Sequence, residues 1–297
     1  MTKQLPVWRS LLFVPVNVER YVEKAHERGA DAIQLDLEDS VPLAEKAHAR
    51  TLVAEAAAKV RRGGADVVVR INRPWRMALR DLEASVGPDV DAVALPKVAG
   101  AQHVRLVAEV LDELERERGL EPGRTKLICM IETADAFFQA HEVAAAHESI
   151  VALNLGAEDF ALSAGMLPEP DGLHYPKVSI VIAARAAGIL PLGFVGTVAD
   201  YKDLDTYRAT IARSRRLGFR GSSCIHPAQV AILNEEFAPG AEEVAQAQGM
   251  VEAYDRAIAE GRGSVEYQGR MIDVPIVERA RDLLAIHAAI EERARRR

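Results

Sequence analysis

Residues 126–159 read KLICMIETADAFFQAHEVAAAHESIVALNLGAED and contain two apolar runs that each end in carboxylates. LICMI is followed by Glu132, and IVALNLGA is followed by Glu158 and Asp159. Apolar runs of this kind, separated by a helical segment, are typical of buried parallel strands. Acids at the carboxyl ends of such strands lie at the edge where α/β proteins bind ligands. Two of them suit a hard divalent cation, Mg²⁺ before Mn²⁺.

The alternative interpretation is that these acids cap the helices that follow them, since carboxylates favour helix N-termini. We would prefer capping for either acid alone. The pair favours a ligand site, because the same pattern of strand, polar strand end and helix recurs along the chain.

Strand-like segments alternate with helical segments between residues 11 and 227. Besides the two runs above, they are 11–16, 32–39, 66–72, 92–98, 189–194 and 221–227. A helix is expected to open at Pro176, and the segment from 73 to Val86 is short and poorly periodic. Eight such units predict a closed (β/α)₈ TIM barrel. An open doubly wound sheet is the alternative, but no G-x-G-x-x-G follows the first segment.

Charged or polar residues gather at the carboxyl ends of these strands, whereas glycine turns precede them. The residues are Asp36, Glu38, Asp39, Arg70, Asn72, Lys97, Glu132, Glu158, Asp159 and His226. In a barrel they would converge on one mouth, which indicates an enzyme. Lys97 could in principle form a Schiff base, although beside a metal site an ion pair is the better interpretation. His226 is equally well explained as a substrate contact or as a hydrogen-bonded core histidine.

Composition limits the class of protein. The chain has 297 residues, 49% of them hydrophobic, and a formal net charge of -7, which argues against a general nucleic-acid surface. Cys129 and Cys224 are too few for a disulfide scaffold and lie in apolar runs, which indicates buried free thiols. No apolar run is long enough for a membrane span. We therefore expect a cytoplasmic protein without nucleic-acid or membrane partners.

The pattern changes after residue 238. A helix over 240–260, a glycine-bounded hairpin and a helix over 276–294 are expected there. The hairpin is too short for an independent sheet. We assign 1–238 to the barrel that carries the metal site and 239–297 to a C-terminal lid.

Motifs in order along the chain resemble the citrate lyase β-subunit and malyl-CoA (citramalyl-CoA) lyase family of the HpcH/HpaI aldolase–citrate lyase superfamily. They are RSLLFVP (9–15), GADAIQLDLEDSV (29–41), VVVRIN (67–72), ALPKV (94–98), MIET (130–133), LGAEDF (155–160), IHPAQV (225–230) and GRMIDVP (269–275). The resemblance implies a (β/α)₈ barrel with Mg²⁺ on Glu132 and Asp159. It further implies that Arg70 binds substrate and stabilises negative charge, and that Asp273 on the lid acts in the site of a neighbouring subunit.

By the same resemblance the chain forms a homo-oligomer, a trimer or a hexamer, with lids exchanged between subunits. The implied reaction is Claisen-type cleavage of a 3-hydroxyacyl-CoA thioester of the malyl-, citramalyl- or citryl-CoA type. The products are acetyl-CoA or a homologue and a 2-oxo acid. Asp36, Glu38 and Asp39 would hold metal-bound waters and orient Arg70. Further substrate contacts are expected from Phe13, Lys24, Ile225 and His226.

Two alternatives remain open. One is a metal-dependent aldolase on free hydroxy-oxo acids, and the other is an acyl-CoA thioesterase or a non-catalytic lyase-like protein. One loop also departs from the family pattern, because Val16 and Val18 replace a glycine and an arginine that help seat CoA in relatives. A stiffer loop with one phosphate contact fewer predicts weaker binding of CoA, although Arg20 and Lys24 remain.

Overall fold

The computed structural model describes residues 5–197 and 203–296. The chain divides into two compact units, Met1–Phe237 and Ala238–Arg297. Within the described residues, no helix is both long enough and apolar enough to cross a membrane.

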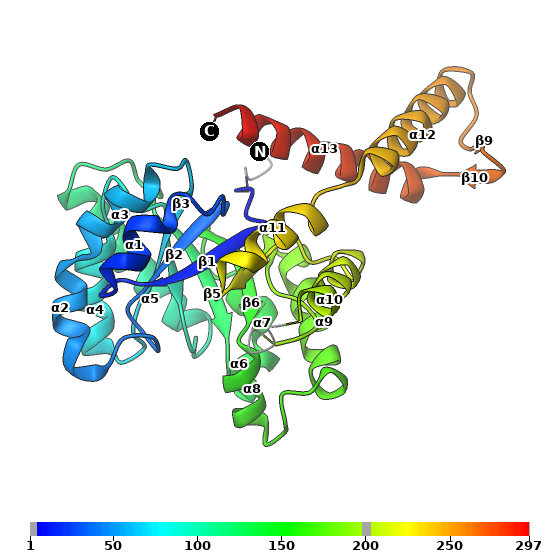
Figure 1. Ribbon diagram of the computed structural model, residues 1–297. Helices are drawn as coiled ribbons and strands as arrows, with labels where there is room; N and C mark the ends of the chain where they lie inside the picture. Colours follow the sequence, from blue (N-terminus) through cyan, green and yellow to red (C-terminus); the bar gives the residue numbers. More distant parts are fainter. Residues whose placement is uncertain (1–4, 198–202, 297) are drawn as a thin grey trace. The chain divides into compact units, whose positions relative to one another are not determined.

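The first unit is built on eight parallel strands (Figure 1). They are β1 (Ser10–Pro15), β2 (Ala32–Asp36), β3 (Asp66–Arg70), β4 (Ala92–Leu95), β5 (Lys126–Ile131), β6 (Ile150–Leu155), β7 (Leu190–Pro191) and β8 (Ser222–Cys224). Their order is β7-β6-β5-β4-β3-β2-β1-β8. A parallel bridge between Leu192 and Gly221 joins the two ends of this order, so the sheet closes on itself. The prediction of a (β/α)₈ barrel is confirmed.

Helices connect the strands of this unit (Figure 1). They are α1 (Glu19–Ala25), the 3₁₀ turn η1 (Leu43–Glu45), α2 (Lys46–Thr51), α3 (Val53–Arg61), α4 (Trp75–Ser85), α5 (Ala101–Glu117), α6 (Ala134–Phe138), α7 (Ala140–Ala144), α8 (Ala157–Ala164), α9 (Pro170–Ala186), α10 (Leu204–Arg216) and α11 (Pro227–Glu236). Since successive strands are parallel, each connection returns the chain to the same end of the barrel. All the carboxyl ends of the strands therefore lie at one mouth.

Two hydrophobic clusters lie on the two faces of the closed sheet. The alternation of side chains along a strand separates them. Val68 of β3 belongs to a small inner cluster with Ala32, Ala92 and Ile128. Val67 and Val69 belong to the large outer cluster that also includes residues of the helices. The inner cluster contains several alanines, which suits the narrow interior of an eight-stranded barrel.

Two sequence-based descriptions of helices are corrected. The segment from 73 to Val86, described from sequence as short and poorly periodic, forms the regular helix α4, whose buried face includes Ala78, Asp81 and Leu82. These buried positions follow the helical period, but one of them is charged, so apolar residues alone do not reveal that period. The helix expected to open at Pro176 instead begins at Pro170, and Pro176 lies inside it.

The second unit contains α12 (Ala241–Ala259), the antiparallel hairpin β9 (Val265–Tyr267) and β10 (Arg270–Ile272), and α13 (Val274–Arg296). Tyr254, Ile272 and Val277 form its buried cluster. Gly249 of α12 is required for this packing, since a Cβ there would come within 2.0 Å of the Tyr267 hydroxyl. Asp273 is partly exposed between β10 and α13, and its carbonyl accepts hydrogen bonds from the backbone N–H groups that open α13.

Candidate functional site

The period of two along each strand determines which side chains enter the barrel mouth. In β2, Asp36 continues the inward series that starts at Ala32, and in β3 Arg70 follows the inward-facing Val68. In β5, Glu132 comes two residues after the inward-facing Met130. The residues at the mouth are therefore the last members of the rows that fill the barrel interior.

Arg70 is the centre of the first group of charges. Its Nε and Nη2 donate to the two carboxylate oxygens of Asp36 at 2.7 and 2.8 Å, a bidentate pair. Its Nη1 lies 3.0 Å from Glu38 Oε2 and 3.1 Å from Asp39 Oδ2. The guanidinium carbon stands 4.7 Å from the ring centroid of Phe13. Carboxylates and an aromatic ring thus fix the orientation of the guanidinium.

Asp36 also shapes the loop that carries its neighbours. It accepts hydrogen bonds from the backbone N–H of Glu38 at 2.9 Å and from the N–H and hydroxyl of Ser40 at 3.1 and 2.6 Å. Burial alone would raise the pKa of Asp36, but the Arg70 guanidinium and these donors hold it below its ordinary value. The ionised carboxylate therefore determines both the shape of the loop and the place of Arg70.

Lys97 lies among four carboxylates. Its ammonium nitrogen is 2.8 Å from Glu38 Oε1, 3.7 Å from Asp159 Oδ2, 3.9 Å from Asp39 Oδ1 and 4.0 Å from Glu132 Oε2. Burial would lower the pKa of Lys97, but the hydrogen bond to Glu38 and the surrounding negative charge raise it above its ordinary value. A Schiff-base lysine needs a lowered pKa, so these contacts favour the ion pair.

Glu132 is the most perturbed acid of the site. It is buried, and burial together with the charges of Glu38 and Asp159 raises its pKa to about 8. Its Oε2 accepts the backbone N–H of Lys97 at 2.8 Å. Gly156 leaves room for it, because a Cβ at that position would lie 2.6 Å from Glu132 Oε1. The glycine of the LGAED segment is thus a condition for the position of Glu132.

Glu132 and Asp159 fit a divalent cation. Asp159 lies in the first turn of α8, with its side chain 40% exposed. Both carboxylates lie within 4.0 Å of the same ammonium nitrogen, so they surround a place that a cation already occupies. Across residues 5–197 and 203–296, no group of three or more His, Cys, Asp or Glu is arranged to hold a metal. Two carboxylates with the remaining positions left to water and substrate are typical of Mg²⁺.

A cavity of about 920 Å³ lies next to Arg70. Its lining brings together the predicted substrate contacts Phe13, Lys24, Arg70, Ile225 and His226, with Asp36 and Asp39. Arg20, Lys24 and Arg28 of the α1 segment also line it, four residues apart. Arg20 and Lys24 share a face of α1 and Arg28 follows beyond the end of that helix, so the three together give the cavity a basic wall.

Three further positions singled out from the sequence are His226, Val16 and Asp273. His226 lines the cavity and also caps α11, because its Nδ1 accepts the backbone N–H of Ala228 at 3.2 Å. Val16 is buried and lines a smaller cavity of about 290 Å³ with Asn17 and Glu19. Asp273 belongs to the second unit.

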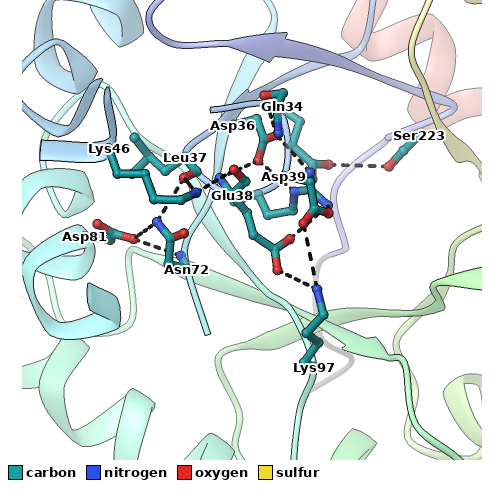
Figure 2. A network of polar contacts seen from close by, with 12 residues as sticks. Gln34, Asp36, Leu37, Glu38, Asp39, Lys46, Asn72, Asp81, Lys97 and Ser223 are labelled. Atoms are coloured by element: carbon teal, nitrogen blue, oxygen red, sulfur yellow. Dashed lines mark hydrogen bonds and ion pairs between the residues drawn. The ribbon is translucent and has the colours of Figure 1, made fainter. Parts of the chain in front are cut away.

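Sequence reasoning missed a polar network behind the loop of Glu38 (Figure 2). Asp81 of α4 accepts the backbone N–H and the side-chain amide of Asn72 at 2.8 and 2.7 Å, and Arg50 Nε at 2.7 Å. Asn72 then donates to the carbonyl of Leu37 at 2.9 Å. Lys46 donates to the carbonyls of Leu37 and Glu38 at 2.8 and 2.6 Å. The network fixes the backbone that presents Glu38.

A barrel with a buried cluster of acids, an arginine and a lysine at its carboxyl mouth, beside a large basic-walled cavity, defines an enzyme of the TIM-barrel class. The family described as HpcH/HpaI aldolase/citrate lyase matches residues 9–227, and the chain belongs to this family. The predictions of the family and of a carbon–carbon lyase are confirmed.

Individual proteins similar to this chain support the same family. The chain is 36% identical to the citrate lyase subunit beta of Haemophilus influenzae over 279 residues, 93% of this chain and 95% of that protein. It is 36% identical to the L-malyl-CoA/beta-methylmalyl-CoA lyase of Cereibacter sphaeroides over 298 residues, 92% of each. The structure is similar to that of CitE from Mycobacterium tuberculosis in complex with magnesium, acetoacetate and coenzyme A. The TM-score is 0.73 at 28% identity, over 97% of this chain and 100% of the other.

Proposed function

We propose that the protein is a Mg²⁺-dependent carbon–carbon lyase that cleaves a 3-hydroxyacyl-CoA thioester of the malyl-, citramalyl- or citryl-CoA type. The products are acetyl-CoA or a homologue and a 2-oxo acid. The observation that carries the proposal is the carboxylate cluster of Glu38, Glu132 and Asp159 beside a cavity with a basic wall. Relatives that bind magnesium with coenzyme A, or with oxaloacetate, support it.

Glu132 and Asp159 would hold the metal, and Mn²⁺ could replace Mg²⁺ there. Held there, the ion would supply a Lewis acid for the oxygens of the 2-oxo acid. Asp36 holds Arg70 with two hydrogen bonds, so the guanidinium is already oriented before substrate arrives. Arg70 stabilises the negative charge that develops on the thioester enolate when the carbon–carbon bond breaks.

The cavity wall favours a CoA substrate over a free hydroxy-oxo acid. Arg20, Lys24 and Arg28 are exposed and line the same cavity as Arg70. A small oxo acid held by a metal does not need three further cations, whereas the phosphates of CoA would form ion pairs with them. Val16 and Val18 led us to predict weaker binding of CoA from the sequence alone. Arg20, Lys24 and Arg28 offer other positive charges for its phosphates.

The decisive test is a screen of CoA thioesters with Mg²⁺, in which acetyl-CoA and the 2-oxo acid are measured separately. Equal amounts of both products from one thioester would support the lyase. Free CoA without an oxo acid would indicate a thioesterase. Cleavage of a free hydroxy-oxo acid, with no thioester cleaved, would indicate an aldolase.

We further propose that Asp273 completes the site of a neighbouring subunit, in a trimer or hexamer. It is the acid between β10 and α13, flanked by Met271, Ile272 and Val274 on the small second unit. Its role would be to protonate the thioester enolate in cleavage and to remove that proton in condensation. Since the barrel and the lid would come from different chains, two inactive variants could complement each other.

Arg70→Ala and Asp273→Ala should each be nearly inactive. When they are dissociated, mixed and reassembled, part of the activity should return, because some sites combine an intact barrel with an intact lid. Reassembly of each variant alone is the control. Absence of recovery in a mixture that contains hybrid oligomers by mass would show that Asp273 does not act between subunits.

A further inference from the structure

Lys97 occupies a position that an ion pair with Glu38 does not fully explain. Its ammonium lies within 4.0 Å of both proposed metal ligands, Glu132 and Asp159. In the part of the chain that the structure describes, no other lysine, arginine or histidine forms an ion pair with either of them. Arg70 is already shared among Asp36, Glu38 and Asp39. One ammonium group therefore offsets much of the charge of the metal-binding acids.

The backbone holds Lys97 in this place. Its φ of 48° lies in the left-handed region, which is unfavourable for a residue with a side chain. Its N–H donates to Glu132 Oε2 at 2.8 Å, and its carbonyl accepts Arg73 Nε at 2.9 Å. A strained residue persists where the surrounding contacts determine it, and such residues are frequent at functional sites.

The position of the Lys97 ammonium affects the repulsion among the carboxylates when no metal is bound. Glu38, Glu132 and Asp159 lie together in a region where Glu132 and Glu38 are buried. Like charges repel strongly there, because the effective dielectric constant is low. A cation that remains attached to the chain reduces this repulsion. The same cation repels any divalent ion that enters between Glu132 and Asp159.

We propose that Lys97 is a resident cation of the metal site, which stabilises the metal-free protein and weakens its affinity for Mg²⁺. Glu38 anchors the ammonium through the 2.8 Å bond, whereas the contacts of 3.7 and 4.0 Å to Asp159 and Glu132 are the ones that a metal replaces. Lys97 is thus a positioning residue that sets the metal affinity. The inference rests on the metal site proposed above.

The test compares wild type, Lys97→Met, Lys97→Arg and Lys59→Met. Lys59 pairs with Glu55 and Glu23 on the surface, so its variant makes the same change in net charge away from the mouth. Each metal-free protein is titrated with MgCl₂ by calorimetry and melted with and without Mg²⁺. Loss of the ammonium that lies 3.7 Å from Asp159 Oδ2 and 4.0 Å from Glu132 Oε2 should tighten Mg²⁺ binding roughly tenfold or more.

Lys97→Met should also melt lower than wild type without Mg²⁺ but close to wild type with it, which widens the shift on binding. Lys97→Arg keeps the charge and Lys59→Met keeps Lys97, so both should bind Mg²⁺ like wild type. Lys97→Gln keeps a polar partner for Glu38 and should show the same tightening, which covers the case that the methionine variant does not fold.

Two results would overturn the inference in distinguishable ways. If Lys97→Met and Lys97→Gln bind Mg²⁺ no more tightly than wild type, while Glu132→Gln abolishes binding, the metal site stands and Lys97 is only a structural ion pair. If the wild-type protein itself binds no Mg²⁺, the proposed metal site and the role of Lys97 fall together.

Discussion

The two ends of the barrel use charge in opposite ways. Two one-to-one cation–acid pairs lie at the amino ends of the strands: Arg9 forms a bidentate pair with the fully buried carboxylate of Asp31, at 2.8 and 3.0 Å, and Arg61 contacts Asp91 at 2.6 Å. At the carboxyl ends, two cations, Arg70 and Lys97, form ion pairs with five acids, which are Asp36, Glu38, Asp39, Glu132 and Asp159.

The difference separates stability from function. A matched buried pair satisfies both partners and stabilises the fold only while both are present. An excess of acids at one mouth is unfavourable until a cation binds there. Burial is the main cause of the raised pKa values of Glu38 and Glu132, and the charges of neighbouring acids add to it. TIM barrels in general place their active sites at the carboxyl end and leave the other end to stability.

The largest effect is expected from Glu132→Gln. Removal of a proposed metal ligand should lower kcat/KM by about 10³-fold or more, since the metal supplies most of the charge stabilisation. The fold should remain intact, because glutamine keeps the size of the side chain and an oxygen that can accept the backbone N–H of Lys97. Steady-state kinetics and calorimetry with Mg²⁺ check this, with Asp159→Ala as the companion variant. Unchanged Mg²⁺ binding in Asp159→Ala would contradict the assignment.

The pKa of Glu132 gives the same prediction a pH dependence. The ordinary value of 4.5 applies to the unfolded chain and about 8 to the folded, metal-free protein. Between these values the unfolded chain releases a proton that the folded protein keeps. The free energy of unfolding of the metal-free protein should therefore fall as pH rises from 4.5 to about 8. Glu132→Gln should lose this part of the slope in denaturation at several pH values.

Asp31→Asn tests the opposite end of the barrel. It leaves the guanidinium of Arg9 without its buried charge partner, and breaking a buried pair costs roughly 3–5 kcal/mol of the free energy of unfolding. The affinity for Mg²⁺ should not change, because Asp31 lies at the amino end of β2. Urea denaturation and calorimetry measure the two quantities. A weakened Mg²⁺ affinity in a variant that remains folded would contradict the separation of the two ends.

The sequence predicts features that depend on local patterns, but not contacts between residues that are far apart in the chain. Apolar runs and polar strand ends are local features, so they predict the barrel and the convergence of Asp36, Arg70 and Glu132. The contact of Lys97 with Glu38 spans 59 positions, and only the closed sheet brings the two together. Asp81 was missed because a buried acid on α4 looks like a break in an apolar face. Its partner Asn72 was visible as a strand end, but nothing local showed what it holds.

Asp81→Asn sharpens the comparison, because Asp81 is a fully paired acid near the functional end. It accepts from Arg50 and from both nitrogens of Asn72, so the change should cost about 2–3 kcal/mol of stability. Through Asn72 and the Leu37 carbonyl it should also displace Glu38 and lower kcat about tenfold, since small misplacements near the chemistry are costly. A stability loss with unchanged kcat would place Asp81 with the amino-end pairs. Asp31→Asn is the control, as it should lose stability without loss of kcat.

The smallest effect is expected from Lys24→Met, on the basic wall of the cavity. Lys24 is exposed, so its loss should leave the free energy of unfolding within about 0.5 kcal/mol of wild type. If it contacts a phosphate of CoA, the contact is the same in the ground and transition states, and KM should rise roughly three- to tenfold with kcat unchanged. The effect should shrink as salt is added, since an exposed charge is screened. Lys59→Met, on the neighbouring helix α3, is the matched control and should leave KM unchanged. An equal rise in both variants would mean that the net charge of the protein, and not the wall of the cavity, attracts the substrate.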